Sequence, residues 1–193
     1  FWARVLGVVF LIPFIYFLIR GYFKKEMVKP LIILFLLGAL QGAVGWIMVA
    51  SGLTGDAVYV KPTRLALHFI FAMGLLCYTY WFALQLLVPK HQKVYYPALK
   101  NFTWLLVVLL VIQFIYGALM AGHKAATAAY TWPDINGSYF PEFMFGAPAG
   151  LMNLIENKIT IHFVHRGLAY VLLLLIIIYS VKIFKTPGSG TFR

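Results

Sequence analysis

The amino-acid sequence predicts an all-α integral membrane protein with about five transmembrane helices. Of its 193 residues, 63% are hydrophobic and only 11% are charged, whereas soluble domains carry about 25% charged residues. The apolar runs are continuous rather than alternating, which is typical of membrane-spanning helices and not of a transmembrane β-barrel. This composition excludes the function classes that need a soluble globular domain.

The net charge of +11 reports membrane topology rather than nucleic-acid binding. Most Lys and Arg residues lie in short segments between the apolar runs, and short basic loops stay on the cytoplasmic side of a membrane. We therefore expect a multi-pass protein that contacts lipid and binds no nucleic acid. The loops expected on the external side are residues 51–63 and 123–158.

Five apolar runs are long enough to cross a bilayer, which takes about 20 helical residues. They are expected at residues 1–19, 30–50, 64–88, 102–122 and 158–183. The expected domains are residues 1–88 with three spans, a cytoplasmic linker over residues 89–100, and residues 101–193 with two spans and the external loop 123–158. Gln41 and Gly45 recur at the same spacing as Gln113 and Gly117. The shared spacing suggests close helix packing and an internal repeat.

Several ionisable side chains enter the predicted spans, where they are costly unless they have partners. His165 and Arg166 lie about 10 Å along the helix from Lys158, at 1.5 Å per residue. His68 follows Arg64 by about one turn at the start of the third run. Alternation of the loops places His68 and His165 at similar depths near the external face.

This arrangement predicts heme binding, because facing helices of membrane bundles commonly supply histidine ligands to heme iron. We expect His68 and His165 to bind iron. Arg166 and Arg64 suit a heme propionate, because guanidinium binds carboxylate bidentately. Other roles stay open, since a membrane histidine can simply pack and Arg64 can anchor to lipid headgroups. A packing role is favoured for His162 and His123, and no clustered ligand set predicts a zinc site.

The predicted external loop 123–158 is long, lacks clear secondary structure, and is rich in aromatic residues. Two interpretations are open. Loops of this length are uncommon unless they have a function, such as covering a site. Aromatic residues also form belts at the membrane surface. The residues concerned include Tyr130, Trp132, Tyr139 and Phe140.

Four segments in consecutive order resemble heme A synthase, and the resemblance covers essentially the whole chain. They are QGAVGWIMVASGL at residues 41–53, RLALH at residues 64–68, residues 117–122 leading into YTWP at 130–133, and residues 157–170. The resemblance implies eight transmembrane helices in two similar four-helix halves, each with a heme pocket lined by two histidines. The chain would then be an internal piece of such a protein, with activity expected of the whole rather than of this piece.

The resemblance also implies the reaction, which is the stepwise oxidation of a methyl group of heme O to the formyl of heme A for terminal oxidases. His68 matches the second histidine of the pocket thought to receive heme O, and would be catalytic. His165, in a Phe-x-His-Arg motif, matches the first histidine of the pocket that holds heme b. The implied partners are heme O, a heme O synthase and an electron donor or acceptor, in a bacterial plasma membrane or a mitochondrial inner membrane.

The chain departs from the family pattern in two ways. The histidine partners of His68 and His165 would lie outside residues 1–193, so each pocket keeps one ligand here. Some relatives carry a cysteine pair in an outer loop, whereas this chain has only Cys77, within an apolar run, so no intrachain disulfide can form. Two other functions remain open. A b-type cytochrome would bind heme without converting heme O, and a small-solute transporter would bind none.

Overall fold

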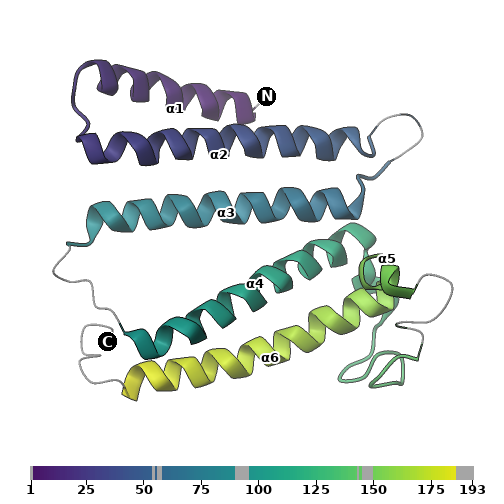
Figure 1. The fold of residues 1–193 in the computed structure, drawn as a ribbon. Coiled ribbons are helices and arrows are strands. Elements are labelled where there is room, and N and C mark those ends of the chain that lie inside the picture. The colour runs from purple at the N-terminus through teal and green to yellow at the C-terminus, as the bar shows by residue number, and fades with distance from the viewer. Residues whose placement is uncertain are drawn as a thin grey trace. The chain divides into compact units, whose positions relative to one another are not determined.

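The computed structural model confirms the predicted all-α membrane architecture (Figure 1). It describes residues 2–53, 55, 58–89, 96–142, 144 and 150–185, so residues 90–95 of the predicted linker lie outside the described part. Within these ranges every regular element is a helix, and a lone antiparallel bridge joins Ile135 to Ser138. The chain divides into two compact units, Phe1–Val94 and Tyr95–Arg193.

The first unit contains three helices, α1 (Trp2–Ile19), α2 (Lys25–Ala50) and α3 (Pro62–Leu87). α1 packs on α2, and α2 packs on α3 (Figure 1). Pro62 occupies the first turn of α3, where the N–H that proline lacks would be unsatisfied in any case. α2 begins before the predicted start at residue 30, because the hydropathy pattern marks only the apolar part of a helix. Pro30 lies inside α2, as proline can in a membrane helix when neighbouring groups satisfy the freed backbone oxygen.

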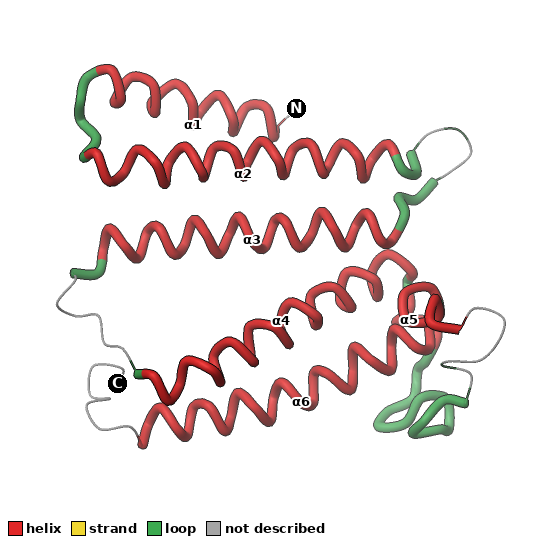
Figure 2. Tube along the Cα trace, viewed as in Figure 1, coloured by secondary structure: helices red, strands yellow, loops and turns green. Residues whose placement is uncertain are grey.

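The second unit pairs two long helices, α4 (Pro97–His123) and α6 (Lys158–Lys185). The segment between them contains the short 3₁₀ helices η2 (Ala125–Ala128) and η3 (Gly150–Met152) and the short helix α5 (Asn153–Glu156) (Figure 2). The expectation of a loop without secondary structure is therefore wrong in part. Short runs of this kind carry too little periodicity to be recognised in a sequence.

Asn157 defines where α6 begins. Its Oδ1 accepts hydrogen bonds from the backbone N–H groups of Ile159 at 2.9 Å and Thr160 at 3.2 Å. An asparagine at this position satisfies two of the N–H groups that a helix leaves free at its start. The cap fixes the start of α6 and therefore the position of His165 along the helix, about two turns from that start.

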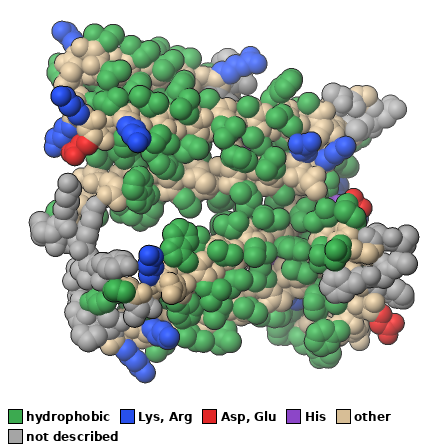
Figure 3. Space-filling view, viewed as in Figure 1, with side chains coloured by type: hydrophobic (Ala, Val, Ile, Leu, Met, Phe, Trp, Pro, Cys, Tyr) green, Lys and Arg blue, Asp and Glu red, His purple; other side chains and the backbone are tan. Residues whose placement is uncertain are grey.

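Four helices in the described part are long and apolar enough to cross a membrane: Lys25–Ala50, Pro62–Leu87, Leu99–His123 and Lys158–Lys185. The first predicted span is a shorter apolar helix, Arg4–Ile19. Helices of 25 to 28 residues are about 38–42 Å long, more than the hydrocarbon core of about 30 Å. Hydrophobic side chains cover their outer surfaces, and Lys and Arg gather near helix ends (Figure 3). The chain is an integral, multi-pass membrane protein.

The tightest packing of the second unit lies where η2 meets α4 and α6. The side chains of Leu119 and Ile161 are 1% and 0% exposed. Ala125 and Thr160 are fully buried beside them. Helices in lipid associate mainly through such close contacts, because lipid is as apolar as the side chains. This cluster lies one helical turn from His165 and fixes that end of the α4–α6 pair.

Replacing Leu119 with alanine should loosen this cluster. A buried Leu→Ala change usually costs about 2–5 kcal/mol, and we expect the lower end here because lipid also solvates the side chain after unfolding. The midpoint of thermal unfolding in detergent should fall. Leu173→Ala is the control, since Leu173 on α6 is 61% exposed. Equal losses in both variants would contradict a packed cluster at Leu119.

Candidate functional site

His68 lies on α3 with its imidazole packed against α2. Nε2 of Gln41 lies 3.4 Å from Nε2 of His68 and also donates to the backbone oxygen of His68 at 3.2 Å. Gly45, one turn after Gln41, faces the same ring. A β-carbon at Gly45 would lie 2.9 Å from Cε1 of His68, closer than side chains tolerate. Glycine therefore allows the ring to lie directly against the α2 backbone.

His165 lies on α6 in an equivalent arrangement with α4. Nε2 of Gln113 lies 3.5 Å from Nε2 of His165. A β-carbon at Gly117, one turn after Gln113, would lie 3.4 Å from Cε1 of His165. Each unit thus packs a histidine against a Gln-x-x-x-Gly segment of a neighbouring helix. This likeness is what an internal repeat would produce, and the contact in the first unit is the tighter of the two.

An imidazole is a common axial ligand of heme iron, and His68 and His165 each keep one ring nitrogen without a hydrogen-bond partner among the described residues. An iron-binding imidazole needs one ring nitrogen without another partner, while its second nitrogen usually bonds a fixed group. Nδ1 of His68 and Nδ1 of His165 are buried and have no hydrogen-bond partner among the described residues. The other ring nitrogen, Nε2, faces a glutamine amide in each case. His162 shares this feature, because its Nδ1 is also buried without a partner among the described residues. The free ring nitrogen alone therefore does not single out His68 and His165.

The close contacts also restrict where a macrocycle can lie. The ring of His68 fills the space beside Gly45 on α2, and the ring of His165 leaves room for no more than a β-carbon beside Gly117 on α4. A heme therefore does not fit between either ring and its glutamine-bearing helix. α2 and α4 support the histidines from behind, and a heme would have to approach from another side.

The two predicted arginines have different surroundings. Arg64 is exposed on α3, one turn before His68, and is accessible to an anionic group. Nη1 of Arg166 donates to the backbone oxygens of Thr131 at 3.1 Å and Asp134 at 2.6 Å. Nη2 of Arg166 bonds Nε2 of His162 at 3.0 Å. Three of the five guanidinium N–H groups are thus engaged, so Arg166 ties the connecting segment to α6 and keeps two donors for a ligand.

The two other histidines in the described part, His162 and His123, have protein partners. His162 is 8% exposed, and its Nε2 accepts the hydrogen bond from Arg166. Nε2 of His123 lies 2.9 Å from the backbone oxygen of Ile155 and joins the end of α4 to α5. Nδ1 of His162 is buried without a partner among the described residues, so the packing roles expected of His162 and His123 stay predictions. In the described part, no group of three or more His, Cys, Asp or Glu side chains could hold a metal ion.

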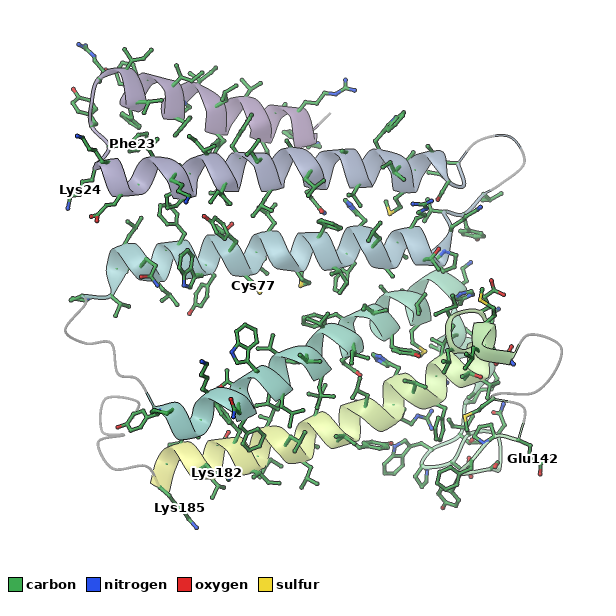
Figure 4. The ribbon with its side chains drawn as sticks, in the orientation of Figure 1. Phe23, Lys24, Cys77, Glu142, Lys182 and Lys185 are labelled. Carbon is green, nitrogen blue, oxygen red and sulfur yellow. The ribbon has the colours of Figure 1, made fainter. Side chains whose placement is uncertain are left out.

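The aromatic segment of residues 130–140 is fastened to α6. Nε1 of Trp132 donates to the hydroxyl of Tyr170 at 2.6 Å. The ring centroids of Phe140 and Phe163 are 5.9 Å apart, and Arg166 adds its two bonds to backbone oxygens. These contacts fix the segment to α6, while its four aromatic side chains remain 66–83% exposed. Both interpretations, a cover and a belt, therefore stay predictions. In Figure 4 the labelled Glu142 follows it near the start of α6.

A tight turn shapes this segment. Asn136 and Gly137 have φ of 53° and 89°, and the backbone N–H of Ile135 donates to the oxygen of Ser138 at 2.8 Å. Nδ2 of Asn136 also donates to the oxygen of Ala128 at 2.8 Å, which holds the turn against η2. Asn-Gly pairs are typical of turns with positive φ. The sequence therefore contained a signal for this turn, which our sequence analysis did not use.

The carboxylate of Asp134 closes the same turn. The hydroxyl of Thr131 and the backbone N–H of Gly137 lower the pKa of Asp134 below its usual value, and the guanidinium of Arg166 contributes in the same direction. The lowered pKa means that the ionised form is favoured in the folded state. The stabilisation is present above the usual pKa of aspartate and is lost as the pH falls through the lowered value.

The glycine contacts can be tested by adding a methyl group. Gly45→Ala should disturb the ring of His68, because overpacking typically costs about 1–3 kcal/mol. Gly117→Ala should cost less, since its β-carbon meets His165 at 3.4 Å instead of 2.9 Å. We expect this order in thermal unfolding of the detergent-solubilised protein. Gly42→Ala on α2 is the control, because nothing lies within 4 Å of its β-carbon position. A loss at Gly42 as large as at Gly45 would contradict the role of the ring contact.

The shifted carboxyl group can be observed directly. Carbon-13 NMR of Asp134 over a pH titration should give a midpoint below the usual aspartate value. Thr131→Val should move that midpoint upward, because it removes the hydroxyl that contributes most to the shift. Thr127→Val is the control, since the Thr127 hydroxyl bonds the oxygen of Lys124 instead. An unchanged midpoint in Thr131→Val would mean that the hydroxyl does not stabilise the carboxylate.

Comparisons with known proteins agree with the geometry. A protein named heme A synthase from Bradyrhizobium sp. strain BTAi1 is 41% identical over 191 residues, which is 98% of this chain and 52% of that protein. Proteins of the same name from Wolbachia pipientis wMel and Rhodospirillum centenum are each 38% identical, over 182 and 195 residues. These matches cover 93% and 100% of this chain and 52% and 51% of the two relatives.

The chain spans about half the length of the curated relatives that it matches. No solved structure matches it. The family model described as cytochrome oxidase assembly protein matches residues 1–192. Because that model covers nearly the whole chain, the chain belongs to the cytochrome oxidase assembly protein family.

Proposed function

We propose that the protein is a heme A synthase, an oxidoreductase that converts a methyl group of heme O to the formyl group of heme A for a terminal oxidase. The observation that carries this proposal is the repeated setting of His68 and His165, each half-buried against a Gln-x-x-x-Gly segment of the neighbouring helix. The similarity to proteins named heme A synthase supports it. Two histidines in equivalent settings suit an enzyme that handles one heme as substrate and a second as cofactor.

In this proposal, His68 binds the iron of the substrate heme O, and His165 binds the iron of heme b. A bound heme supplies electron transfer, while the protein supplies binding, orientation and electrostatics. The exposed Arg64 is placed to pair with a propionate beside His68. Arg166 does the same beside His165 with the donors that the connecting segment leaves free. The second ligand of each iron is expected from residues that this chain does not span.

The reaction also sets requirements outside the chain. Conversion of a methyl group to a formyl group removes electrons and adds one oxygen atom. An electron acceptor and an oxygen source must therefore meet the site, and a heme O synthase must supply the substrate. Because heme O is strongly apolar, the membrane-embedded position of the histidines lets substrate reach them through lipid.

The histidine assignments can be tested in the full-length protein produced together with a heme O synthase. His165→Ala should remove most of the heme b absorption, because the iron loses an axial ligand. His68→Ala should keep heme b and abolish formation of heme A. Optical spectra of the purified protein and analysis of the extracted hemes measure both effects. His123→Ala is the control, since its ring bonds Ile155 and faces neither proposed pocket.

The outcomes separate the proposed enzyme from the two other functions. Heme A that disappears in His68→Ala would support the enzyme. Heme b without any heme A in the unaltered protein would overturn it in favour of an electron-carrying cytochrome. The absence of any heme would leave His68 and His165 as packing residues and would favour a transporter.

A further inference from the structure

The aromatic segment of residues 130–140 holds its four rings in place without covering them. The segment is bonded to α6 through the indole of Trp132 and the guanidinium of Arg166. Large apolar groups that stay exposed on an ordered surface indicate a contact with something else. The exposed rings belong to Tyr130, Trp132, Tyr139 and Phe140.

The charges of α6 indicate where this helix enters the apolar part of a bilayer. Ionisable side chains occur along it up to Arg166, and residues 167–181 contain no Lys, Arg, His, Asp or Glu. Residues 167–185 end with the basic residues of the last turn and are about 28 Å long at 1.5 Å per residue. This length is close to the hydrocarbon thickness of about 30 Å. The boundary at the first end of α6 therefore lies near Arg166.

Trp132 is bonded to α6 just inside this boundary. Its Nε1 donates to the hydroxyl of Tyr170, which lies about 6 Å along the helix from the boundary. Tyr170 also begins an exposed apolar stripe on one face of α6, and the indole borders that stripe. The stripe continues, at helical spacing, with Leu173, Leu174 and Ile177.

The backbone of the segment meets a requirement of irregular structure near a bilayer, where polar groups must find partners within the protein. The backbone oxygens of Thr131 and Asp134 accept hydrogen bonds from Arg166. Five backbone N–H groups donate to oxygens of the segment itself, and they belong to Ile135, Asn136, Gly137, Ser138 and Phe140. The segment can therefore approach lipid without leaving these groups unsatisfied.

We propose that the aromatic segment is a membrane anchor, whose four exposed rings lie in the interfacial layer of the leaflet where α6 begins. Tyrosine and tryptophan favour this layer because their rings are apolar and their polar atoms can meet headgroups or water. The anchor holds α6 at a fixed depth, with Arg166 at the boundary and the apolar stripe below it. This inference goes beyond the proposed function, because it concerns lipid and requires no bound heme.

Nitroxide labels can locate the segment in the full-length protein, reconstituted in vesicles of phosphatidylcholine and phosphatidylglycerol. Labels are attached at Tyr130→Cys and Tyr139→Cys after the other cysteines, Cys77 among them, are replaced by serine. Oxygen concentrates in the bilayer and a nickel chelate stays in water, so collision of each agent with the label reports its surroundings. Leu173→Cys on α6 is the lipid reference, and Lys24→Cys, an exposed position between α1 and α2, is the water reference.

We expect both labels to collide more with oxygen and less with nickel than the label at Lys24→Cys. Collision with nickel as frequent as at that position would place the segment in water. Labels that neither agent reaches would show that another part of the full-length protein covers the rings. Either result would overturn the anchor and leave the proposed function standing.

The bond between Trp132 and Tyr170 can be tested by fluorescence in the same vesicles. Subtracting the emission of Trp132→Phe from that of the unaltered protein isolates the signal of Trp132. Lipids brominated near the headgroup end of the acyl chain should quench this signal more than lipids brominated near the methyl end. Equal quenching by both lipids would contradict an interfacial position.

Tyr170→Phe keeps the ring and removes the acceptor of the Trp132 bond. This change should reduce the difference between the two brominated lipids, because the indole is no longer held at one depth. Tyr179→Phe is the matched control on the same helix, since the Tyr179 hydroxyl bonds that of Thr103. An unchanged difference in Tyr170→Phe, or an equal reduction in Tyr179→Phe, would overturn the role of this bond in the anchor.

Discussion

The contact between an imidazole and the backbone of a neighbouring helix organises each unit. His68 can lie against α2 only because Gly45 occupies the facing position, whereas His165 faces Gly117 of α4 with room for a β-carbon at 3.4 Å. In lipid, this kind of close approach is what holds helices together. The same contact therefore serves packing and site geometry, and it fixes one face of each ring while leaving a ring nitrogen unpartnered. Both the pairing of the helices and the chemistry of the site depend on it.

The helices could be predicted from the sequence because continuous apolar runs of about 20 residues have few alternative structures in a membrane. Their ends were less accurate. α2 begins at Lys25 and α4 at Pro97, before the apolar runs. Polar residues can extend a helix beyond the apolar part that hydropathy marks. The short helices between α4 and α6 were missed for the opposite reason. They are held by contacts such as that of Asn136 with Ala128, which no local pattern reveals.

The ionisable residues of the candidate site could be predicted from the sequence, but the groups that they contact could not. A histidine or arginine inside an apolar run indicates a functional site, because burial of an ionisable group without a partner is unfavourable. The sequence did not show that Arg166 would bond the backbone oxygens of Thr131 and Asp134, since contacts over such separations depend on the tertiary fold. The repeated Gln-x-x-x-Gly spacing could be seen in the sequence. Its contact with histidines of α3 and α6 could not, because it depends on how the helices pack.

Two hydrogen bonds join Arg166 on α6 to the connecting segment, next to His165 in the chain. Arg166 directly follows His165 in the chain, so a rotation of α6 that redirects the imidazole also pulls on the guanidinium and on the aromatic segment. The hydrogen bonds of Arg166 therefore restrict rotation of α6 at His165, and the connecting segment helps to fix the direction of that imidazole.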